Sequence, residues 1–324
     1  MKKYQLLAIL LIAMPLCACN ILPTISRNNS SKSASKEDSG EPEPEQSFEL
    51  IIDEANRTAT YGLYPQQRVS DQKLKSRLEQ LPKNQANKFG WFFLDGKYYV
   101  REAATPFDFE GKYRQDPAYF SDRTTIERGI FYWYECSPIT WRILDKNDNK
   151  YYLLSENCLD VSAFNASGSA PSGYFPNSWE TSTLREFLNN DFLEKAFFYD
   201  DQYIIQTEVY NTASTTNNSS NPYAIDMPSF DYVFCPSYED YHNVDYGFNN
   251  DISRLSHTTD YGRARGVWFE NQSAEREFCA DYFARSPDYS NSSKSSRVSE
   301  RGELWTYDVT DEFGSVRPAI TVAI

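Results

Sequence analysis

The chain has 324 residues and a formal net charge of −14, from 32 Lys and Arg against 46 Asp and Glu. A surface of this sign repels the phosphate backbone, so we do not expect nucleic-acid binding. Aromatic residues make up 16% of the chain, which is typical of a β-rich domain that uses them in its core and in cross-strand pairs. A binding face built from exposed Tyr is the alternative use of so many aromatic side chains.

The N-terminus predicts export and lipid attachment. Lys2 and Lys3 precede a run of about nine apolar residues, whereas a transmembrane helix needs about 20, so residues 1–18 indicate a secretory signal peptide. Residues 16–19, Leu-Cys-Ala-Cys, resemble a bacterial lipobox. The resemblance implies cleavage before Cys19 and acylation of Cys19, which would hold the protein on the membrane, facing out of the cell. The alternative is an ordinary secretory signal with incidental cysteines.

A polar tether is predicted to follow the lipid anchor. Residues 19–47 are dominated by Ser, Asn, Lys, Glu and Pro, with almost no apolar residue after Ile25. Such a segment cannot build a core, and it suits an extended spacer. Residues 48–324 contain no tandem repeat and no break in composition, so we predict a single domain there.

The first half of this domain predicts strands around one helix. Residues 58–71 indicate a short strand and a turn, and residues 71–81 a helix with Asp71 as its cap. Two aromatic strands flank Asp95-Gly96, a strong hairpin signal. Residues 105–128 indicate a loop, and residues 129–160 two strands, a turn at 147–149 and a third strand.

The second half predicts one long helix and several short strands. Residues 181–198 carry a helical apolar stripe, with Thr183 and Glu186 as a capping box and a break at 189–191. A polar loop is expected at 211–222 and a short helix within 237–244. Strands are expected at 231–237, 266–272, 277–288, 303–309 and 315–324. This order predicts the α+β class, as an irregular domain with short antiparallel strands and two or three helices.

Four cysteines lie in the predicted domain, and their spacing matches no metal or redox motif. Cys136 and Cys158 flank the predicted hairpin and would approach each other across it, which allows a disulfide outside the cytoplasm. The alternative is that Cys136, Cys158, Cys235 and Cys279 are buried thiols. His242 and His257 are interpreted as surface or hydrogen-bonded residues rather than as ligands.

No established catalytic signature is present in the sequence. We find no phosphate-binding glycine loop, no HExxH, no GxSxG and no EF-hand pattern. Neighbouring carboxylates are frequent in so acidic a chain, and without a fold none can be assigned an acid or a nucleophile role. We therefore predict no catalytic residue, no metal ligand and no cofactor.

Eight short motifs, in order, resemble a family of bacterial extracytoplasmic domains known as domain of unknown function 6273, over almost all of residues 60–324. The motifs are YGLYP (61–65), GKYYV (96–100), ITWRIL (139–144), YYLLS (151–155), SWETSTLREFLNNDFLEKAF (178–197), DYVFCPS (231–237), DYFARSP (281–287) and GSVRPAI (314–320).

More loosely, the layout is similar to C-type-lectin-like and formylglycine-generating-enzyme-like domains. That resemblance implies an irregular α+β fold in which the N- and C-terminal strands pair. The resemblance does not imply the oxidase activity of the formylglycine-generating enzymes. That activity needs two cysteines close together near the C-terminal end, and only Cys279 lies there. The calcium motifs of the lectins are absent as well.

Four arginines, Arg142, Arg185, Arg285 and Arg317, fall on the family motifs. Their planar, five-donor heads suit internal clasps that hold loops through carboxylates and carbonyls. The alternative is a cluster that grips an anionic ligand. We assign structural roles to Trp141, Arg185 and Arg317, and we name Arg285, Trp268 and Trp305 as candidate ligand contacts.

Location, composition and fold resemblance together favour recognition of an extracellular ligand, either a glycan or a protein. A cell-envelope hydrolase that uses two carboxylates is one alternative, and a purely structural envelope domain is another. An enzyme would bring two carboxylates together in a cleft and raise the pKa of one of them.

Overall fold

The computed structural model describes residues 49–108, 117–198, 201–210, 222–223, 227–270 and 273–324. The predicted signal peptide, Cys19 and the tether lie outside the described residues, as does nearly all of the predicted polar loop at 211–222. The strands described form an eight-stranded, a five-stranded and a two-stranded sheet, accompanied by short helices. The predicted α+β class is therefore confirmed. Within these residues, no helix has the length and apolar character needed to cross a bilayer.

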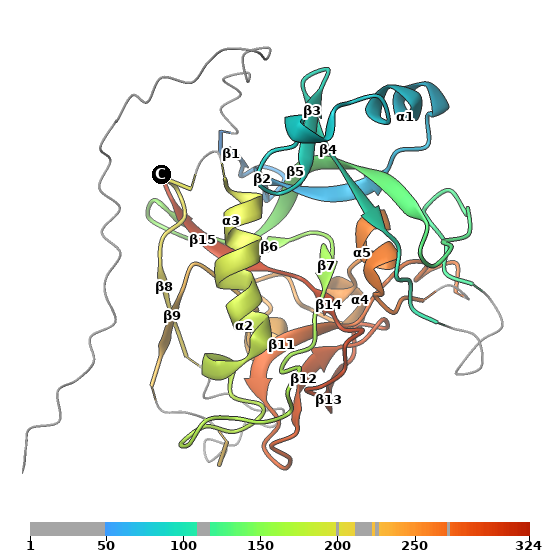
Figure 1. The fold of residues 1–324 in the computed structure, drawn as a ribbon. Helices are drawn as coiled ribbons and strands as arrows, with labels where there is room; N and C mark the ends of the chain where they lie inside the picture. The colour runs from blue at the N-terminus through green and yellow to red at the C-terminus, as the bar shows by residue number, and fades with distance from the viewer. Residues whose placement is uncertain (1–48, 109–116, 199–200, 211–221, 224–226, 271–272) are drawn as a thin grey trace, which may run out of the picture. The chain divides into compact units, whose positions relative to one another are not determined.

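The large sheet is antiparallel, and its middle is built from strands that are far apart in the sequence (Figure 1). Its strand order is β1 (Ile51–Asp53), β2 (Thr58–Arg68), β5 (Phe131–Asn147), β6 (Lys150–Ser155), β15 (Ala319–Ala323) and β10 (Val233–Phe234), and β3 (Trp91–Leu94) and β4 (Lys97–Ala103) join it beside β5. The last strand pairs with β6 and β10. The pairing of N- and C-terminal strands implied by the lectin-like resemblance is therefore wrong for the strands described.

Strand β5 is one continuous strand, although two were predicted around Ser137-Pro138. On the side away from β2, β4 pairs with β5 as far as Cys136 and β6 pairs from Trp141 onward. Pro138 lies in the gap between these two partners. Because no strand on that side requires a hydrogen bond from Pro138, its missing N–H does not interrupt the sheet.

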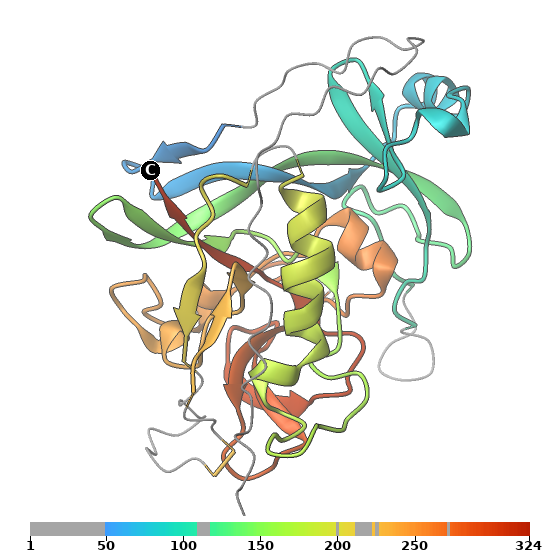
Figure 2. The ribbon, with the colours of Figure 1, turned by 60° about the vertical axis from the view of Figure 1, so that its left-hand side comes forward.

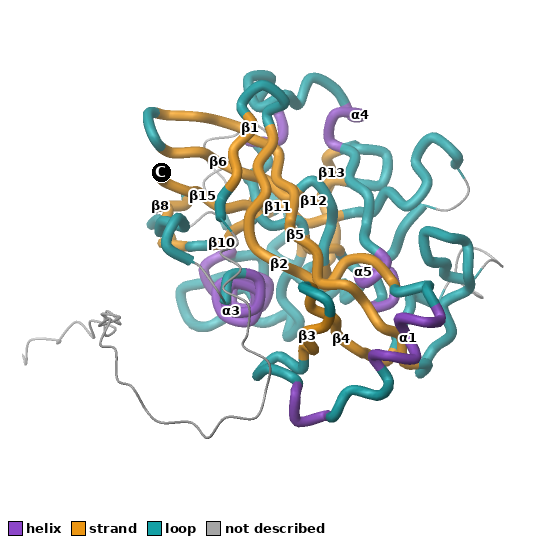
Figure 3. Tube along the Cα trace, turned by 90° about the horizontal axis from the view of Figure 1, so that it is seen from above, coloured by secondary structure: helices purple, strands orange, loops and turns teal. Residues whose placement is uncertain are grey.

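The hairpin and the first helix agree with the sequence pattern. Asp95 and Gly96 join β3 to β4 with φ angles of 51° and 78°, the left-handed pair that two-residue hairpins favour. Helix α1 (Gln72–Leu78) begins at Asp71, whose carboxylate accepts from the N–H groups of the helix's first turn. Figure 3 shows α1 beside the β3–β4 hairpin. Leu78 of α1 and Tyr99 of β4 form a small second core together with Val69, which follows β2, and Trp133 of β5.

The long predicted helix is continuous and contains the predicted break as a π-helical turn. It comprises α2 (Thr183–Phe187), the π segment η3 (Leu188–Phe192) and α3 (Leu193–Ala196), and it packs on β2 and β10 (Figure 2). Asn189 stabilises the break, because its side chain donates to the Val233 carbonyl at 2.8 Å. The predicted cap is wrong by one residue: Ser182 accepts from the Arg185 N–H, whereas Thr183 accepts from the Ala166 N–H.

Gly62 is required where the end of this helix meets β2. Its φ angle is +71°, and an added Cβ would lie 2.6 Å from the Phe197 ring and 2.9 Å from the Ala196 carbonyl oxygen. The register of β2 against β5 shifts between Thr60 and Leu63. The glycine of the YGLYP motif therefore permits both the bulge in β2 and the close packing of the end of the helix against this strand.

The five-stranded sheet contains a strand that the pattern did not predict. Its order is β13 (Leu304–Asp308), β12 (Lys294–Val298), β11 (Tyr282–Pro287), β14 (Ser315–Val316) and β7 (Asp160–Val161). Strand β12 was missed because Ser295, Ser296 and Arg297 are polar, yet all three are buried. The two-stranded sheet consists of β8 (Thr207–Val209) and β9 (Ser229–Asp231).

Two short helices replace predicted loop, and one predicted strand is wrong. Helices α4 (Asp251–Arg254) and α5 (Asp260–Arg265) carry no apolar stripe long enough to be recognised. In the strand predicted at 266–272, the only pairing among the residues described is an isolated bridge from Phe269 to Ala280. The helix expected within 237–244 is a single 3-10 turn, Asp240–His242.

The C-terminal segment was predicted as one strand but belongs to two sheets. Strand β14 lies in the five-stranded sheet and β15 lies in the large one, and Arg317-Pro318 makes the passage between them (Figure 1). Proline cannot donate to a ladder, so it suits a position where pairing changes from one sheet to the other. This segment therefore connects the two sheets.

The four cysteines of the domain are free and buried. Of the two possibilities that the sequence left open, the buried thiols are therefore confirmed, and Cys136 and Cys158 form no disulfide. Cys136 pairs with Tyr98 inside the large sheet, whereas Cys158 lies beyond the end of β6, where its thiol contacts the Ser256 hydroxyl at 3.4 Å. The long reach of β5 past β6 separates the two positions.

Candidate functional site

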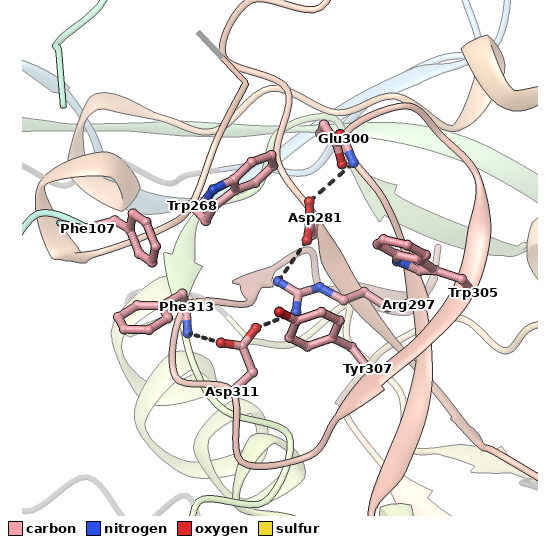
Figure 4. Close-up of a pocket in the computed structure, with 9 residues that line it drawn as sticks. All are labelled: Phe107, Trp268, Asp281, Arg297, Glu300, Trp305, Tyr307, Asp311 and Phe313. Atoms are coloured by element: carbon pink, nitrogen blue, oxygen red, sulfur yellow. Dashed lines mark hydrogen bonds and ion pairs between the residues drawn. The ribbon is translucent and has the colours of Figure 1, made fainter. Parts of the chain in front are cut away.

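A cavity of about 450 Å³ opens at one face of the five-stranded sheet. It combines aromatic rings with a group of charged side chains (Figure 4). Its lining residues are Phe107, Trp268, Asp281, Arg297, Glu300, Trp305, Tyr307, Asp311 and Phe313.

Strand register builds one wall of the cavity. Phe283 pairs with Arg297, and Arg297 pairs with Trp305, so these three side chains form a row across one face of the sheet. Tyr307 follows Trp305 by two residues and projects from the same face, with the two ring centroids 6.4 Å apart. Because β13 is the edge strand, these rings remain accessible: Trp305 is 47% exposed and Tyr307 is 36% exposed.

Arg297 is the buried centre of this wall. Its side chain is 1% exposed, and its guanidinium lies between the rings of Phe283 and Tyr307, 5.0 and 4.7 Å from their centroids. It forms ion pairs with Asp281, at 3.2 Å, and with Asp311. Its Nε–H has no hydrogen-bond partner in the part of the chain that the structure describes. One donor in the wall of the cavity is therefore unsatisfied.

Asp281 is the most perturbed carboxyl of the cavity. Burial raises the pKa of Asp281 from 3.8 to about 6; the negative charges of Glu300 and Asp311 add to this rise, and Arg297 opposes it. The Asp281 carboxylate also accepts a hydrogen bond from the Glu300 N–H at 3.2 Å. Around neutral pH the cavity therefore holds carboxylates that lack full compensation by positive charge.

The opposite wall is apolar and comes from loops. Trp268 follows α5, and its backbone N–H donates to the Phe313 carbonyl at 3.2 Å. The rings of Phe107 and Phe313 meet edge to face, with centroids 4.6 Å apart. Figure 4 shows Trp268 and Trp305 on opposite sides of the charged group. A ligand in this cavity would therefore lie among aromatic rings with carboxylates close by.

Of the three candidate ligand contacts named from the sequence, two line this cavity and one lies elsewhere. Trp268 and Trp305 belong to the cavity. Arg285 is buried at a different place, where it donates to the Cys235 carbonyl at 2.8 Å and pairs with Asp240 at 3.1 Å. Its guanidinium is thus engaged inside the protein.

Of the residues predicted to be structural, Trp141 and Arg317 are buried, and Arg185 is partly buried. Trp141 is 0% exposed and its indole N–H donates to the Tyr61 carbonyl at 2.9 Å. Arg185 pairs with the buried Asp231 at 2.6 Å. Arg317 is 0% exposed and is bonded mainly to backbone carbonyls. Their effect on stability stays a prediction.

Several residues of the cavity could not be selected from the sequence. Asp281, Glu300 and Asp311 are three among 46 acidic residues, and nothing in their spacing marks them. Arg297 was assigned to a polar loop. The one usable signal was the alternation of Trp305 and Tyr307, which places two aromatic rings on the same face of a strand.

The remaining chemistry of the described residues is sparse. No group of three His, Cys, Asp or Glu side chains in them is arranged to hold a metal ion. A second cavity of about 300 Å³ includes His257, Asp260 and Arg263, but the two last side chains are already paired with each other. The aromatic and acidic cavity is therefore the candidate site.

The structure thus defines an α+β protein with an aromatic, acidic cavity at the edge of its five-stranded sheet. Comparison with protein families matches residues 148–324 to the domain of unknown function DUF6273, and the chain belongs to this family. The matched segment contains every residue of the cavity except Phe107, whereas the three family-like motifs before residue 148 lie outside it. No curated protein matches the chain, and no solved structure matches it.

Proposed function

We propose that this protein is a lipid-anchored recognition module that binds a carbohydrate outside the cell. The observation that carries the proposal is the pair of exposed rings, Trp305 and Tyr307, at a cavity that also contains hydrogen-bonding carboxylates. The cavity volume of about 450 Å³ falls in the range of small-ligand sites. This size favours a glycan over a protein surface as the ligand.

The two kinds of lining residue suit the two faces of a sugar. Aromatic rings such as Trp305 offer a flat apolar surface to the C–H face of a pyranose ring. Carboxylates such as Glu300 are acceptors that bind hydroxyl groups. Trp268 on the opposite wall supplies a second aromatic surface.

A hydrolase that uses paired carboxylates is the second candidate function, and one observation favours it. The pKa of Asp281 is raised to about 6 by burial, as a general acid requires, and two further carboxylates line the same cavity. Against this function, Arg297 pairs with both Asp281 and Asp311. Recognition needs neither carboxylate to be free, so we prefer it.

A glycan screen with the full chain, kept in mild detergent, tests the proposal. We expect binding to at least one oligosaccharide of the cell envelope or of a host surface, and a loss of about tenfold or more in affinity in Trp305→Ala, because truncating a central aromatic contact costs about 2 kcal/mol. Phe230→Ala is the matched control, since Phe230 is 53% exposed and does not line the cavity. Turnover of an oligosaccharide that disappears in Asp281→Asn would favour the hydrolase instead. Failure to bind any glycan would favour a structural domain.

The membrane anchor has its own test. We expect Cys19→Ser to move the protein from the membrane fraction to the soluble fraction, because attachment depends on acyl chains at that thiol. Immunoblotting of separated fractions measures this, with Cys17→Ser as the control. Unchanged membrane association of Cys19→Ser would contradict the lipobox interpretation.

A further inference from the structure

The charged residues that line the cavity are unbalanced. Three of them are acidic, namely Asp281, Glu300 and Asp311, and one is basic, Arg297. With all four ionised, the lining carries a formal excess of two negative charges. A neutral sugar would leave this excess uncompensated inside a partly enclosed, low-dielectric space.

Neighbouring cations within the protein do not remove the imbalance. Arg297 is shared between Asp281 and Asp311, so one positive charge serves two carboxylates. Glu300 pairs with Arg301 at 3.2 Å, but the Arg301 side chain is 60% exposed. An ion pair with so exposed a partner contributes little, because water and salt screen it. Glu300, and the two carboxylates of Asp281 and Asp311 that share Arg297, therefore still attract a cation.

The aromatic residues strengthen the same preference. The faces of Trp, Tyr and Phe rings carry partial negative charge and attract cations within about 6 Å. Arg297 already occupies one face of Tyr307 in this way. Trp268 and Trp305 also line the cavity, and the indole ring of Trp attracts cations more strongly than the rings of Tyr and Phe do. Carboxylates and aromatic rings together make a site for a positively charged group.

On these grounds, and resting on the proposed function, we infer that the cavity recognises a sugar that carries a free, protonated amino group. The ammonium would lie near Glu300 and between the aromatic walls. An N-acetylated oligosaccharide with the same number of sugar units keeps the rings and the hydroxyl groups, but the acetyl group removes the charge.

Isothermal titration of the full chain with matched oligosaccharides tests this inference. The probes are a glucosamine tetramer, the N-acetylglucosamine tetramer and the glucose tetramer of the same β-1,4 linkage, at about pH 6.5, below the ordinary pKa of amino groups. We expect the glucosamine tetramer to bind about tenfold or more tightly than either neutral tetramer, and to weaken as salt is added.

Glu300→Gln separates charge from shape. It should reduce the affinity for the glucosamine tetramer by about fivefold or more, because the charge is lost. The affinity for a neutral tetramer should fall by about twofold or less, because the amide keeps the size of the carboxylate and one oxygen acceptor for hydroxyl groups. Glu303→Gln is the control, because it makes the same change in net charge three residues away and outside the cavity lining.

The outcomes distinguish the two proposals. Equal binding of the three tetramers would overturn the preference for an amino sugar and leave the carbohydrate function standing. An equal effect of Glu300→Gln and Glu303→Gln would overturn the placement of the ammonium in this cavity. If no tetramer binds, and the broader screen also finds no glycan, both proposals fail.

Discussion

Replacement of Arg317 by alanine is expected to destabilise the protein strongly. Arg317 is 0% exposed, and its guanidinium donates to the Ser155 carbonyl at 2.9 Å and to the Tyr282 hydroxyl at 2.8 Å. Two longer contacts reach the carbonyls of Arg254 and Glu156, at 3.3 and 3.4 Å. This one side chain thus joins the passage between the two sheets to the end of β6 and to β11.

The size of this destabilisation follows from the hydrogen-bond acceptors that lose their donor when Arg317 is replaced by alanine. A buried acceptor that loses its donor costs about 1–3 kcal/mol, and two of the contacts of Arg317 are short. Loss of packing against the Tyr282 ring, 5.0 Å from the guanidinium, adds to this cost, while removal of a buried cation offsets part of it. We therefore expect Arg317→Ala to lower the free energy of unfolding by about 3–5 kcal/mol, a large share of the 5–15 kcal/mol that holds an ordinary domain together.

Urea unfolding followed by tryptophan fluorescence measures this change. Arg317→Lys keeps the charge but can satisfy fewer acceptors, so we expect an intermediate loss of about 1–2 kcal/mol. Arg301→Ala is the surface control, because its side chain is 60% exposed, and it should stay within about 0.5 kcal/mol of the parent. An Arg317→Ala protein that is as stable as the parent but no longer binds ligand would refute the assignment of Arg317 as an internal clasp.

Two further predictions concern backbone strain and pH. Gly62→Ala should lower the free energy of unfolding by about 2–4 kcal/mol, because the left-handed backbone disfavours alanine and the added Cβ would collide with Phe197 and Ala196. Gly90 has a φ angle of +76° and open space around it, so Gly90→Ala should show only the loss that comes from the backbone conformation. Equal melting temperatures of the two variants would contradict the packing argument. For Asp281, the pKa raised from 3.8 to about 6 means that the native state binds the proton more tightly. Its contribution to stability is therefore full below about pH 4 and is lost as pH rises through 6, by about 2 kcal/mol or more. Asp281→Asn should remove this pH dependence between pH 4 and 7 in urea titrations, and an unchanged slope would contradict it.

Local signals predicted local structure well. Asp71 caps α1, Asp95-Gly96 turns the β3–β4 hairpin, and the polar break at 189–191 coincides with a π-helical turn. Each of these depends on interactions within a few residues, which composition and spacing report directly. The cap at Ser182 rather than Thr183 marks the usual uncertainty at a helix end.

The candidate site was beyond the same reasoning because tertiary structure assembles it. Strand β12 has Ser295, Ser296 and Arg297 where an apolar pattern would reveal a strand, and their burial depends on partners in other strands. Asp281 precedes β11 and Asp311 follows β13, and only Arg297 between them brings the two carboxylates together. Trp268 and Trp305 could be named as candidates, whereas their position beside these carboxylates could not be predicted.

The place of β15 within the large sheet has a consequence for folding kinetics. This strand lies between β6 and β10. Strand β10 therefore cannot join the sheet beside β6 until residues 319–323, at the C-terminal end of the sequence, have paired with both strands. The entropy of closing that long loop is lost before any ladder bond compensates for it. Refolding should therefore be slow and should pass through states in which the edges of β6 and β10 are open to association with other chains.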